Sequence, residues 1–400
     1  MENVESPLPV FPPVRPPLGP PEDYARFRES EPVKAVETPS GTKAWLVTRY
    51  ADIREMLRGE GLSSDPRTPG FPAFVGFRRL SADGTTPRIP LVDMDQPEHT
   101  LYRRVVAPEL TMRAVSRLVP AITELVDSLL DAMERSGPPA DLVASFTSQI
   151  PSRVICRMLG FPPEDSDYFY QFAEEANAEQ TSLQRRVQVQ REMSDYIARQ
   201  VAVRENLPGE EFIDRLLAAR DSGILPPDEV VNVARMMYSA GVGTTANALA
   251  LSVAALLVHR DQAAVIADEK ADLPRAVEEL LRWTSIVHGL ARVTRSPLEI
   301  QGRRIPTGEG VLLALPAANH DPEAFPDPDR LDLTRTPGDQ LGFGQGIHQC
   351  PGQQLARAEL QIGLSRLFRR FPSLSLRVSI EELEYKKGFV HGVKALPVEW

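Results

Sequence analysis

The sequence predicts a mainly α-helical protein with a minor β-sheet, and two patterns support this prediction. Between residues 97 and 270, apolar residues recur every three or four positions, which is the spacing of amphipathic helices. Short β-like runs separated by turns occupy residues 34–49 and 290–315. The 400 residues show no repeat and no linker. We therefore expect one domain over residues 1–400 with a proline-rich N-terminal arm at residues 1–22.

The first hundred residues predict two strands, a helix and a long loop. The strands flank a Pro-Ser-Gly turn in residues 34–49, and TRYADIREMLRG follows with helical spacing. Residues 61–92 are rich in glycine, proline, serine and phenylalanine and have no sustained period, which is typical of a functional or irregular loop. Phe71, Phe74 and Phe77 make this loop a candidate apolar lid, or a loop held by aromatic packing.

The remainder of the chain predicts helices, then short strands, then one more helix. A long helix covers about residues 228–259, and LPRAVEELLRWTS forms another. Residues 290–315 form short strands, and residues 320–335 form a proline-punctuated meander. A last helix begins just after Cys350, and residues 388–400 form a terminal strand or hairpin. Cys156 lies on an apolar helical face and is expected in the core.

Composition and charge exclude several classes of function. The formal net charge is -10, which argues against general binding to nucleic acid or to anionic membranes. Two distant cysteines form neither a disulfide framework nor a zinc site, and they fit a reducing cytoplasm. The N-terminus has no signal-peptide or membrane-span run, and ALALSVAALLVH is short for a bilayer crossing. We expect a cytoplasmic protein.

The stretch AGVGTTAN, residues 240–247, interrupts the long apolar helix with two glycines and two threonines. Each glycine inside a helix costs about 1 kcal/mol relative to alanine. Either the glycines relieve packing, or another group comes very close to the backbone here.

The segment GFGQGIHQCPG, residues 342–352, places a single cysteine among closely spaced glycines. Glycines let the backbone bend and lie flat against a large group. A thiolate just before a helix gains from the helix dipole and from free backbone amides. A cluster of several thiolates is excluded, which leaves a single axial thiolate to a haem iron, or a buried structural cysteine. The spacing F-G-x-G-x-H-x-C-x-G favours the haem ligand.

Residues 343–352 resemble the haem-binding loop of the cytochrome P-450 superfamily, in its soluble bacterial class. The resemblance extends from AWLVTRYADIREML to KALPVEW, and VEELLRWTSIVHGLARVT is similar to actinobacterial enzymes that tailor secondary metabolites. It implies the P-450 fold, with haem b held between a long distal helix and the cysteine loop. It also implies that Cys350 is the proximal iron ligand, that Gly344 contacts the haem, and that Phe343 packs near the sulfur.

The same resemblance implies partners for the haem propionates and a structural ion-pair triad. His99 and Arg103 in EHTLYRR, Arg292 in LARVT and His348 in GIHQC are assigned to the propionates. The residues of the structural ion-pair triad are Glu279, Arg282 and Arg330. Glu279 and Arg282 are three residues apart on a helix and can pair.

The central helix matches the family pattern A/G-G-x-D/E-T, with one departure. Ala240 and Gly241 are assigned to the oxygen groove, and Thr244 is the alcohol that helps to deliver protons. Gly243 stands where the family usually has an acid that supplies protons. Three explanations are open. Water organised near Thr244, Thr245 or Asn247 replaces this acid, or the substrate supplies a polar group, or the reaction does not need the usual protons.

Substrate contacts are expected from variable segments around the haem. The pocket residues implied by the resemblance are Phe74, Leu91, Val92, Met237, Val287, His288, Leu290, Phe389 and Val390. His288 either orients a substrate polar group or points away from the haem. A mostly apolar pocket suits a polyketide, terpenoid or aromatic molecule.

The chain has no flavin or nicotinamide fingerprint, so electrons must come from another protein. The resemblance implies a ferredoxin and its reductase, using NAD(P)H. Ferredoxins are acidic, so we expect a basic patch on the cysteine side, made of Arg103, Arg104, Arg113 and Arg357.

We therefore expect a monomeric haem-thiolate monooxygenase that inserts one oxygen atom into an apolar small molecule, without nucleic-acid or membrane partners. Gly243 motivates an alternative within the same family, an oxidase that forms a ring, a double bond or a coupling bond, or that is driven by peroxide. An alternative from another class is a haem sensor or binding protein without turnover.

Overall fold

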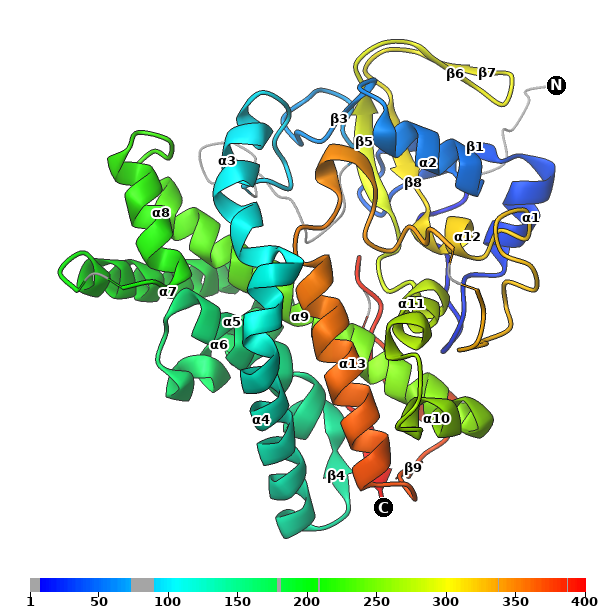
Figure 1. Cartoon of the computed structure of the whole chain (residues 1–400). Helices are drawn as coiled ribbons and strands as arrows, with labels where there is room; N and C mark the ends of the chain where they lie inside the picture. The colour runs from blue at the N-terminus through cyan, green and yellow to red at the C-terminus, as the bar shows by residue number, and fades with distance from the viewer. Residues whose placement is uncertain (1–7, 73–89, 178–180, 208, 337, 387) are drawn as a thin grey trace.

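The computed structural model describes residues 8–72, 90–177, 181–207, 209–336, 338–386 and 388–400. Helices make up most of the described chain, and the main sheet lies beside them with the N-terminal segments (Figure 1). The predicted class, mainly α with minor β, is confirmed.

The main sheet joins N-terminal segments to strands of residues 290–313. Its strand order is β1-β2-β8-β5-β3, with β2 parallel to β8 and the other pairs antiparallel. Trp45 pairs with Val311, so segments more than 260 residues apart in the sequence are neighbours. The elements of this region are α1 (Asp23–Ser30), β1 (Val33–Glu37), β2 (Lys43–Val47), α2 (Tyr50–Arg58), β3 (Leu62–Ser63), β5 (Leu290–Thr294), β6 (Leu298–Ile300), β7 (Arg303–Ile305), β8 (Gly310–Leu313) and α12 (Leu315–Asn319).

The described part of the N-terminal arm packs on this region. Phe11 is fully buried, and its backbone N–H donates to Glu37 O at 2.8 Å. The Arg15 guanidinium donates to Gly19 O and Ser285 O, both at 2.8 Å, and also to Thr284 O. The arm is therefore fixed to the end of α11 (Leu273–Thr284).

The helical part is built around α9 (Glu229–Val258), which crosses the molecule behind α13 and α4 in Figure 1. It packs against α5, α7, α13 and α11. The other elements of the helical part are α3 (Glu98–Val106), α4 (Met112–Ser136), β4 (Ala140–Asp141), α5 (Gln149–Leu159), α6 (Ser166–Asn177), α7 (Leu183–Arg204), α8 (Phe212–Asp221), α10 (Arg260–Ala267), α13 (Gln353–Arg370), β9 (Ser375–Leu376) and β10 (Pro397–Glu399).

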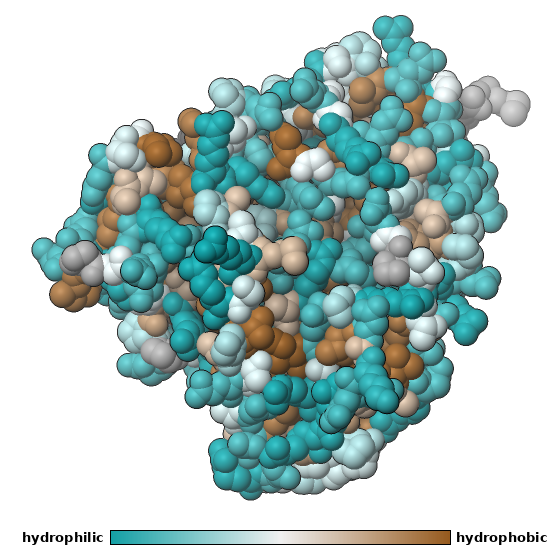
Figure 2. All heavy atoms as spheres, in the orientation of Figure 1, coloured by the Kyte–Doolittle hydropathy of each residue, from teal (hydrophilic) through white to brown (hydrophobic). Residues whose placement is uncertain are grey.

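Among the described helices, α9 is the one long and apolar enough to span a membrane, but 78% of its most apolar window is buried inside the protein. The face of the molecule in Figure 2 is mostly hydrophilic, with separate apolar patches. We therefore interpret α9 as the core helix of a globular protein.

Local sequence signals explain where several helices begin, and the lack of such signals explains why two short strands were not predicted. The side chains of Thr111 and Asp272 accept backbone N–H groups at the starts of α4 and α11, as capping residues do. The terminal strand was expected as β10, but its partners β4 and β9 were not. Each of these has two residues, which is too few to show an alternating pattern.

Candidate active site

The cysteine loop joins the meander to α13, and its shape depends on two glycines. Gly344 and Gly346 have φ of +67° and +73°, which favours glycine. A Cβ at position 346 would lie 2.2 Å from Leu57 O, so a side chain there is excluded. The Cys350 N–H donates to Phe343 O at 2.9 Å and closes the loop. Cys350 is thereby fixed just before α13.

The environment of the Cys350 sulfur combines burial with positive charge. Burial raises the pKa of this thiol, while the N–H groups of Gly352 and Gln353 and the guanidiniums of Arg103 and Arg357 act in the opposite direction. A bound metal cation would supply the remaining stabilisation of the thiolate. These donors fit a cysteine that serves as a metal ligand.

Phe343, which is expected near the sulfur, contacts an arginine of α13 through its ring. The Arg357 guanidinium lies over its ring, 4.6 Å from the ring centroid. Arg357 also donates to Glu278, with Nε–Oε1 at 2.5 Å. Arg357 is therefore neutralised, which corrects the expectation that it contributes to a basic docking patch.

Imidazole and guanidinium groups converge beside the cysteine loop. The rings of His99 and His348 lie 4.4 Å apart, and His348 Nε2 is 3.1 Å from Ser64 Oγ. Burial and then Arg292 lower the pKa of His348 to about 3. Burial and then Arg103 lower the pKa of His99, whose Nε2 is buried without a partner among the described residues. Arg103 Nη1 donates to Gln349 O at 2.6 Å.

This cluster fits a group that carries carboxylates. Asp95 is the nearby carboxylate that acts on both imidazoles, and propionates would satisfy further donors of this cluster. The orphaned His99 Nε2 and the half-buried Cys350 thiol, which lies near Arg103, together fit a haem. The sequence assigned all four side chains of the cluster but missed Ser64, because a lone serine has no motif.

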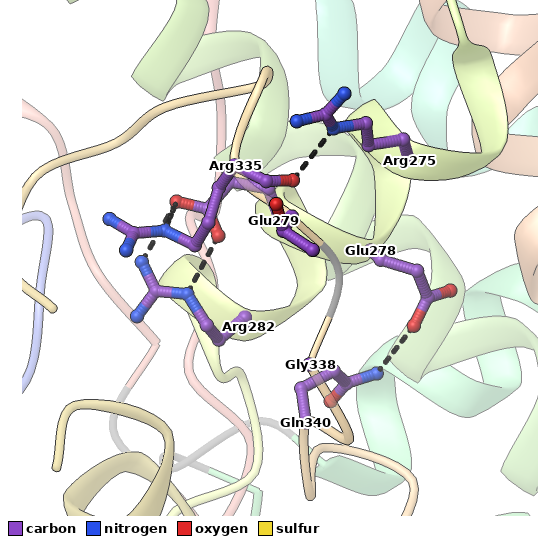
Figure 3. Close-up of a pocket in the computed structure, with 8 residues that line it drawn as sticks. Arg275, Glu278, Glu279, Arg282, Arg335, Gly338 and Gln340 are labelled. Carbon is purple, nitrogen blue, oxygen red and sulfur yellow. Dashed lines mark hydrogen bonds and ion pairs between the residues drawn. The ribbon is translucent and has the colours of Figure 1, made fainter. Parts of the chain in front are cut away.

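The predicted ion pair between Glu279 and Arg282 is present, but its third member is different (Figure 3). Arg282 donates twice to Glu279, with Nε–Oε2 at 2.7 Å and Nη2–Oε1 at 2.9 Å. Arg335 Nε, rather than Arg330, lies 3.0 Å from Glu279 Oε1. The Arg330 side chain is 69% exposed and faces Asp332. Its backbone carbonyl is the part that takes part in the network, where it accepts hydrogen bonds from Arg282 and Arg335.

The middle of α9 presents a stripe of small and polar residues in an otherwise buried helix. Ser239 and Ala240 are exposed, and Gly243 and Thr244 are half-buried. Thr244 Oγ1 donates to Ala240 O at 2.7 Å, as a threonine one turn further along a helix can. We call these four residues the α9 stripe. The stripe places Ala240 and Thr244 on one open face, as predicted.

The two glycines of AGVGTTAN have different roles, which answers the question raised by the sequence. A Cβ at position 241 would lie 2.9 Å from Ile155 Cδ1, so Gly241 permits close packing of α9 on α5. The assignment of Gly241 to the oxygen groove stays a prediction. A Cβ at position 243 would meet no atom within 4 Å. Gly243 therefore leaves open space beside Thr244.

The predicted pocket residues are only partly brought together. Leu290 Cδ1 lies 3.7 Å from the Cβ position of Gly344, and Val287 bridges Val390 beside the half-buried Phe389. Phe74 lies outside the described residues, as does Phe77. Met237 is 6% exposed and packs in the main core instead of on the α9 stripe.

Three other predicted residues lie at the edges of this region. Leu91 is buried, and its N–H donates to Met94 Sδ at 3.2 Å, whereas Val92 is exposed. The His288 ring is buried 6.1 Å from that of His391, whose Nε2 lies 3.2 Å from Pro17 O of the arm. Burial and then Arg15 lower the pKa of His288 to about 3. His288 Nδ1 is buried without a partner among the described residues, and both alternatives for this residue stay open.

Comparison with known proteins agrees with this geometry. The family described as Cytochrome P450 matches residues 179–396. The pentalenic acid synthase of Streptomyces avermitilis is 39% identical over 392 residues, covering 96% of this chain and 95% of that protein. The vitamin D3 dihydroxylase of Streptomyces griseolus is 36% identical over 397 residues, covering 98% and 97%.

A solved structure extends the likeness to three dimensions. The mycinamicin VIII C21 methyl hydroxylase of Micromonospora griseorubida has a TM-score of 0.91 and 32% identity, with 98% of this chain and 100% of that chain covered. Enzymes of this kind act on small substrates and use redox partners. The chain therefore belongs to the cytochrome P450 family and is a haem-dependent monooxygenase.

Proposed function

We propose that this P450 inserts one oxygen atom from O2 into an apolar polyketide, terpenoid or aromatic molecule, with electrons from a ferredoxin. The observation that carries the proposal is the α9 stripe, in which Thr244 and Ala240 share an open face of an otherwise buried helix. Bound haem, held by Cys350, supplies oxygen activation assisted by thiolate electron donation.

Thr244 and the open space beside it supply the proton chemistry. Thr244 Oγ1 donates to the Ala240 carbonyl, which leaves its lone pairs available to accept a hydrogen bond from water. Because nothing fills the space at Gly243, water or a polar group of the substrate can occupy the place of the usual acid. The hydroxyl then holds and passes protons in place of a carboxylic acid.

The surroundings support an apolar substrate and a hydroxylation. Leu290 brings an apolar side chain to the cysteine loop, and Val287 pairs with Val390, next to Phe389. The names of two relatives, the vitamin D3 dihydroxylase and the mycinamicin VIII C21 methyl hydroxylase, support the same type of reaction.

A hollow on the cysteine side supports a ferredoxin donor. Its volume is about 380 Å³, and it is lined by His99, Thr100, Arg103, Arg104, Ala107, Gly346 and Ile347. Ile347 is an exposed apolar residue, and Arg104 is exposed. An apolar centre with a cationic rim suits a small acidic protein that binds transiently.

We also propose that residues 1–400 act as one domain, as a monomer in the cytoplasm. Contacts between segments distant in the sequence, such as β2 with β8, support a single folding unit. Two unpaired cysteines support a reducing compartment.

The first test is an optical titration of the ferric holoenzyme with macrolides, terpenoids and aromatic polyketides. A blue shift of the haem band identifies a compound seated over the iron. That compound is then incubated with a ferredoxin, its reductase, NADPH and ¹⁸O2. We expect a product that is heavier by one ¹⁸O atom.

Gly243 favours a second candidate, an oxidase that forms a ring, a double bond or a coupling bond. It predicts a product that lacks two hydrogens and contains no ¹⁸O. A haem sensor predicts binding without NADPH-dependent oxygen consumption. Either result would overturn the proposed oxygen insertion.

A further inference from the structure

The guanidinium of Arg15, in the N-terminal arm, caps the carboxyl end of α11. Its Nη2 donates to the carbonyl of Thr284, the last residue of the helix, and its Nη1 donates to Ser285 O at 2.8 Å. The last carbonyls of a helix lack partners within the helix and lie at its negative end, so they favour a cation. No carboxylate of the described chain pairs with Arg15, and burial lowers its pKa to about 10. The end of α11 therefore supplies the main partners of this charge.

The backbone turns sharply at the point that Arg15 holds. Ser285 has φ of +36° and ψ of +62°, a left-handed conformation that is unfavourable for residues other than glycine. Asn319 Nδ2 donates to the hydroxyl of Ser285 at 2.7 Å, while Arg15 binds its carbonyl. The turn sets the direction in which residues 286–290 leave α11, and Arg15 is the contact by which the arm holds it.

Beyond the turn, residues 286–288 pair with residues 389–391 in a short antiparallel ribbon, which we call the wall ribbon. Three backbone contacts join its two strands: the bridge between Val287 and Val390, and the hydrogen bonds from His391 N–H to Ile286 O at 2.7 Å and from His288 N–H to Phe389 O at 3.1 Å. Because the strands are joined in this way, a shift of the first strand at the turn moves the second strand as well.

The wall ribbon connects the cysteine loop to α9. Just after its first strand, Leu290 Cδ1 lies 3.7 Å from the Cβ position of Gly344 in the cysteine loop. Just after its second strand, a Cβ at position 392 would lie 2.2 Å from Asn247 Oδ1, three residues beyond Thr244 in α9. Because the haem is expected between the cysteine loop and α9, the ribbon is placed to form a wall of the pocket.

The arm contacts the wall ribbon at further points. Phe11 Cζ lies 3.2 Å from the Cβ position of Gly289, next to the first strand. Pro17 O lies 3.2 Å from Nε2 of His391 in the second strand. A carbonyl can only accept, so this ring nitrogen donates. The arm thus reaches both strands, and Arg15 lies between these two contacts in the sequence.

We propose that Arg15 is a positioning residue for the substrate pocket, which acts through the turn at Ser285 to hold the wall ribbon in its binding position. Without Arg15 the turn loses its partner in the arm, and the ribbon can take several positions. A molecule that fills the pocket must then order the ribbon, which weakens its binding. This inference rests on the proposed function, because it treats Val287 and Val390 as pocket residues.

The test is an optical titration of the ferric holoenzyme with two azoles that bind the iron through nitrogen, imidazole and clotrimazole. Imidazole is small enough to reach the iron without filling the pocket, whereas the three aromatic rings of clotrimazole must pack against its walls. We expect Arg15→Met to weaken clotrimazole binding about tenfold and to change imidazole binding less than about twofold. Arg15→Lys keeps a cation that can donate to Ser285 O, so it should restore most of the affinity for clotrimazole.

Arg28→Met is the matched control for a general loss of stability. Arg28 also donates to a backbone carbonyl, Ala317 O of α12 at 2.9 Å, and its side chain is 12% exposed. It therefore holds α12 instead of the turn at Ser285. This variant should lower the melting temperature but keep the wild-type ratio of the two azole affinities. The 450 nm band of the ferrous carbon monoxide complex verifies the fold and haem of each variant.

The possible failures are distinguishable. Arg15→Gln is a milder change that removes the charge, and it should lose the selectivity for clotrimazole in part even if Arg15→Met folds poorly. An unchanged ratio of affinities in both variants, or an equal loss in Arg28→Met, would show that Arg15 contributes only stability. Azole binding needs no turnover, so that result leaves the proposed oxygen insertion intact. If the wild type binds imidazole but not clotrimazole, the apolar pocket itself is contradicted, and the inference fails with it.

Discussion

At the scale of single residues, position 243 separates this chain most clearly from the usual family pattern. A side chain there would point into open space, so substitution should not disturb the packing of α9. If proton supply limits the reaction, Gly243→Asp should raise the fraction of NADPH that is converted to product. The measurement is the ratio of product formed to NADPH consumed.

Gly243→Asn is the matched control, because it adds a side chain of the same size without an acid. A rise in the ratio of product to NADPH that is confined to the aspartate variant supports proton delivery by the added acid. Equal ratios for the wild type and both variants would show that water or substrate already supplies the protons.

A second residue carries an acid that the proposed reaction does not use. Glu359 of α13 is 1% exposed, and its Oε1 has no partner among the described residues. Burial raises the pKa of Glu359 well above its ordinary value. The folded protein thus holds a proton that the unfolded chain releases above about pH 4.3, the ordinary pKa of a glutamic acid.

The stability that depends on this proton is present below that pH and is lost as the pH rises through the folded pKa. Each unit of the shift corresponds to about 1.4 kcal/mol. Glu359→Gln should therefore melt above the wild type at pH 8, and the difference should shrink toward pH 5. Thermal unfolding of the holoenzyme across this range measures it. Glu323→Gln, at an exposed position, should show no such pH-dependent gap.

At the scale of elements, the network in Figure 3 ties the meander to α11. Removing one partner of a buried ion pair costs about 3–5 kcal/mol, whereas exposed substitutions are usually within about 0.5 kcal/mol. Arg335→Ala should therefore lower the melting temperature and the yield of the 450 nm species. Arg330→Ala, at an exposed position, should behave like the wild type. If Arg330→Ala is the more damaging of the two, the geometric assignment is wrong.

The same network shows what the sequence could and could not predict. Glu279 and Arg282 were predictable because both lie on one helix, where a spacing of three brings them together. Arg335 was not predictable, because the path of the meander decides which arginine contacts Glu279 of α11, and no periodic spacing in the sequence indicates that path. Likewise, the close approach of Gly241 to Ile155 depends on helix packing that no local pattern encodes. The cysteine loop was predictable because its glycines, histidine and cysteine are contiguous.

At the scale of the whole molecule, the net charge of -10 contrasts with the cationic rim around Ile347. If an acidic ferredoxin docks there, local charge must overcome a repulsive total. Arg104→Glu should slow reduction by ferredoxin about tenfold at low salt, and the difference from the wild type should shrink as salt is raised. Stopped-flow reduction of the ferric haem measures this rate.

Arg199→Glu is the control for this experiment, because it changes the net charge equally on α7, at an exposed site away from the hollow. Equal slowing by both variants would point to the total charge instead of a local docking site.

The two cysteines have a practical consequence for following the motion of this enzyme. Cys156 is fully buried, with its pKa raised to about 12 by burial, so it is a poor nucleophile for labelling reagents. If Cys350 binds the haem iron as proposed, its sulfur is not available to labelling reagents in the holoenzyme. A cysteine introduced at Val203, which is 53% exposed on α7, would then be the single reactive thiol of the chain. A fluorophore attached there would report the distance between α7 and the haem, with the haem itself acting as the quencher.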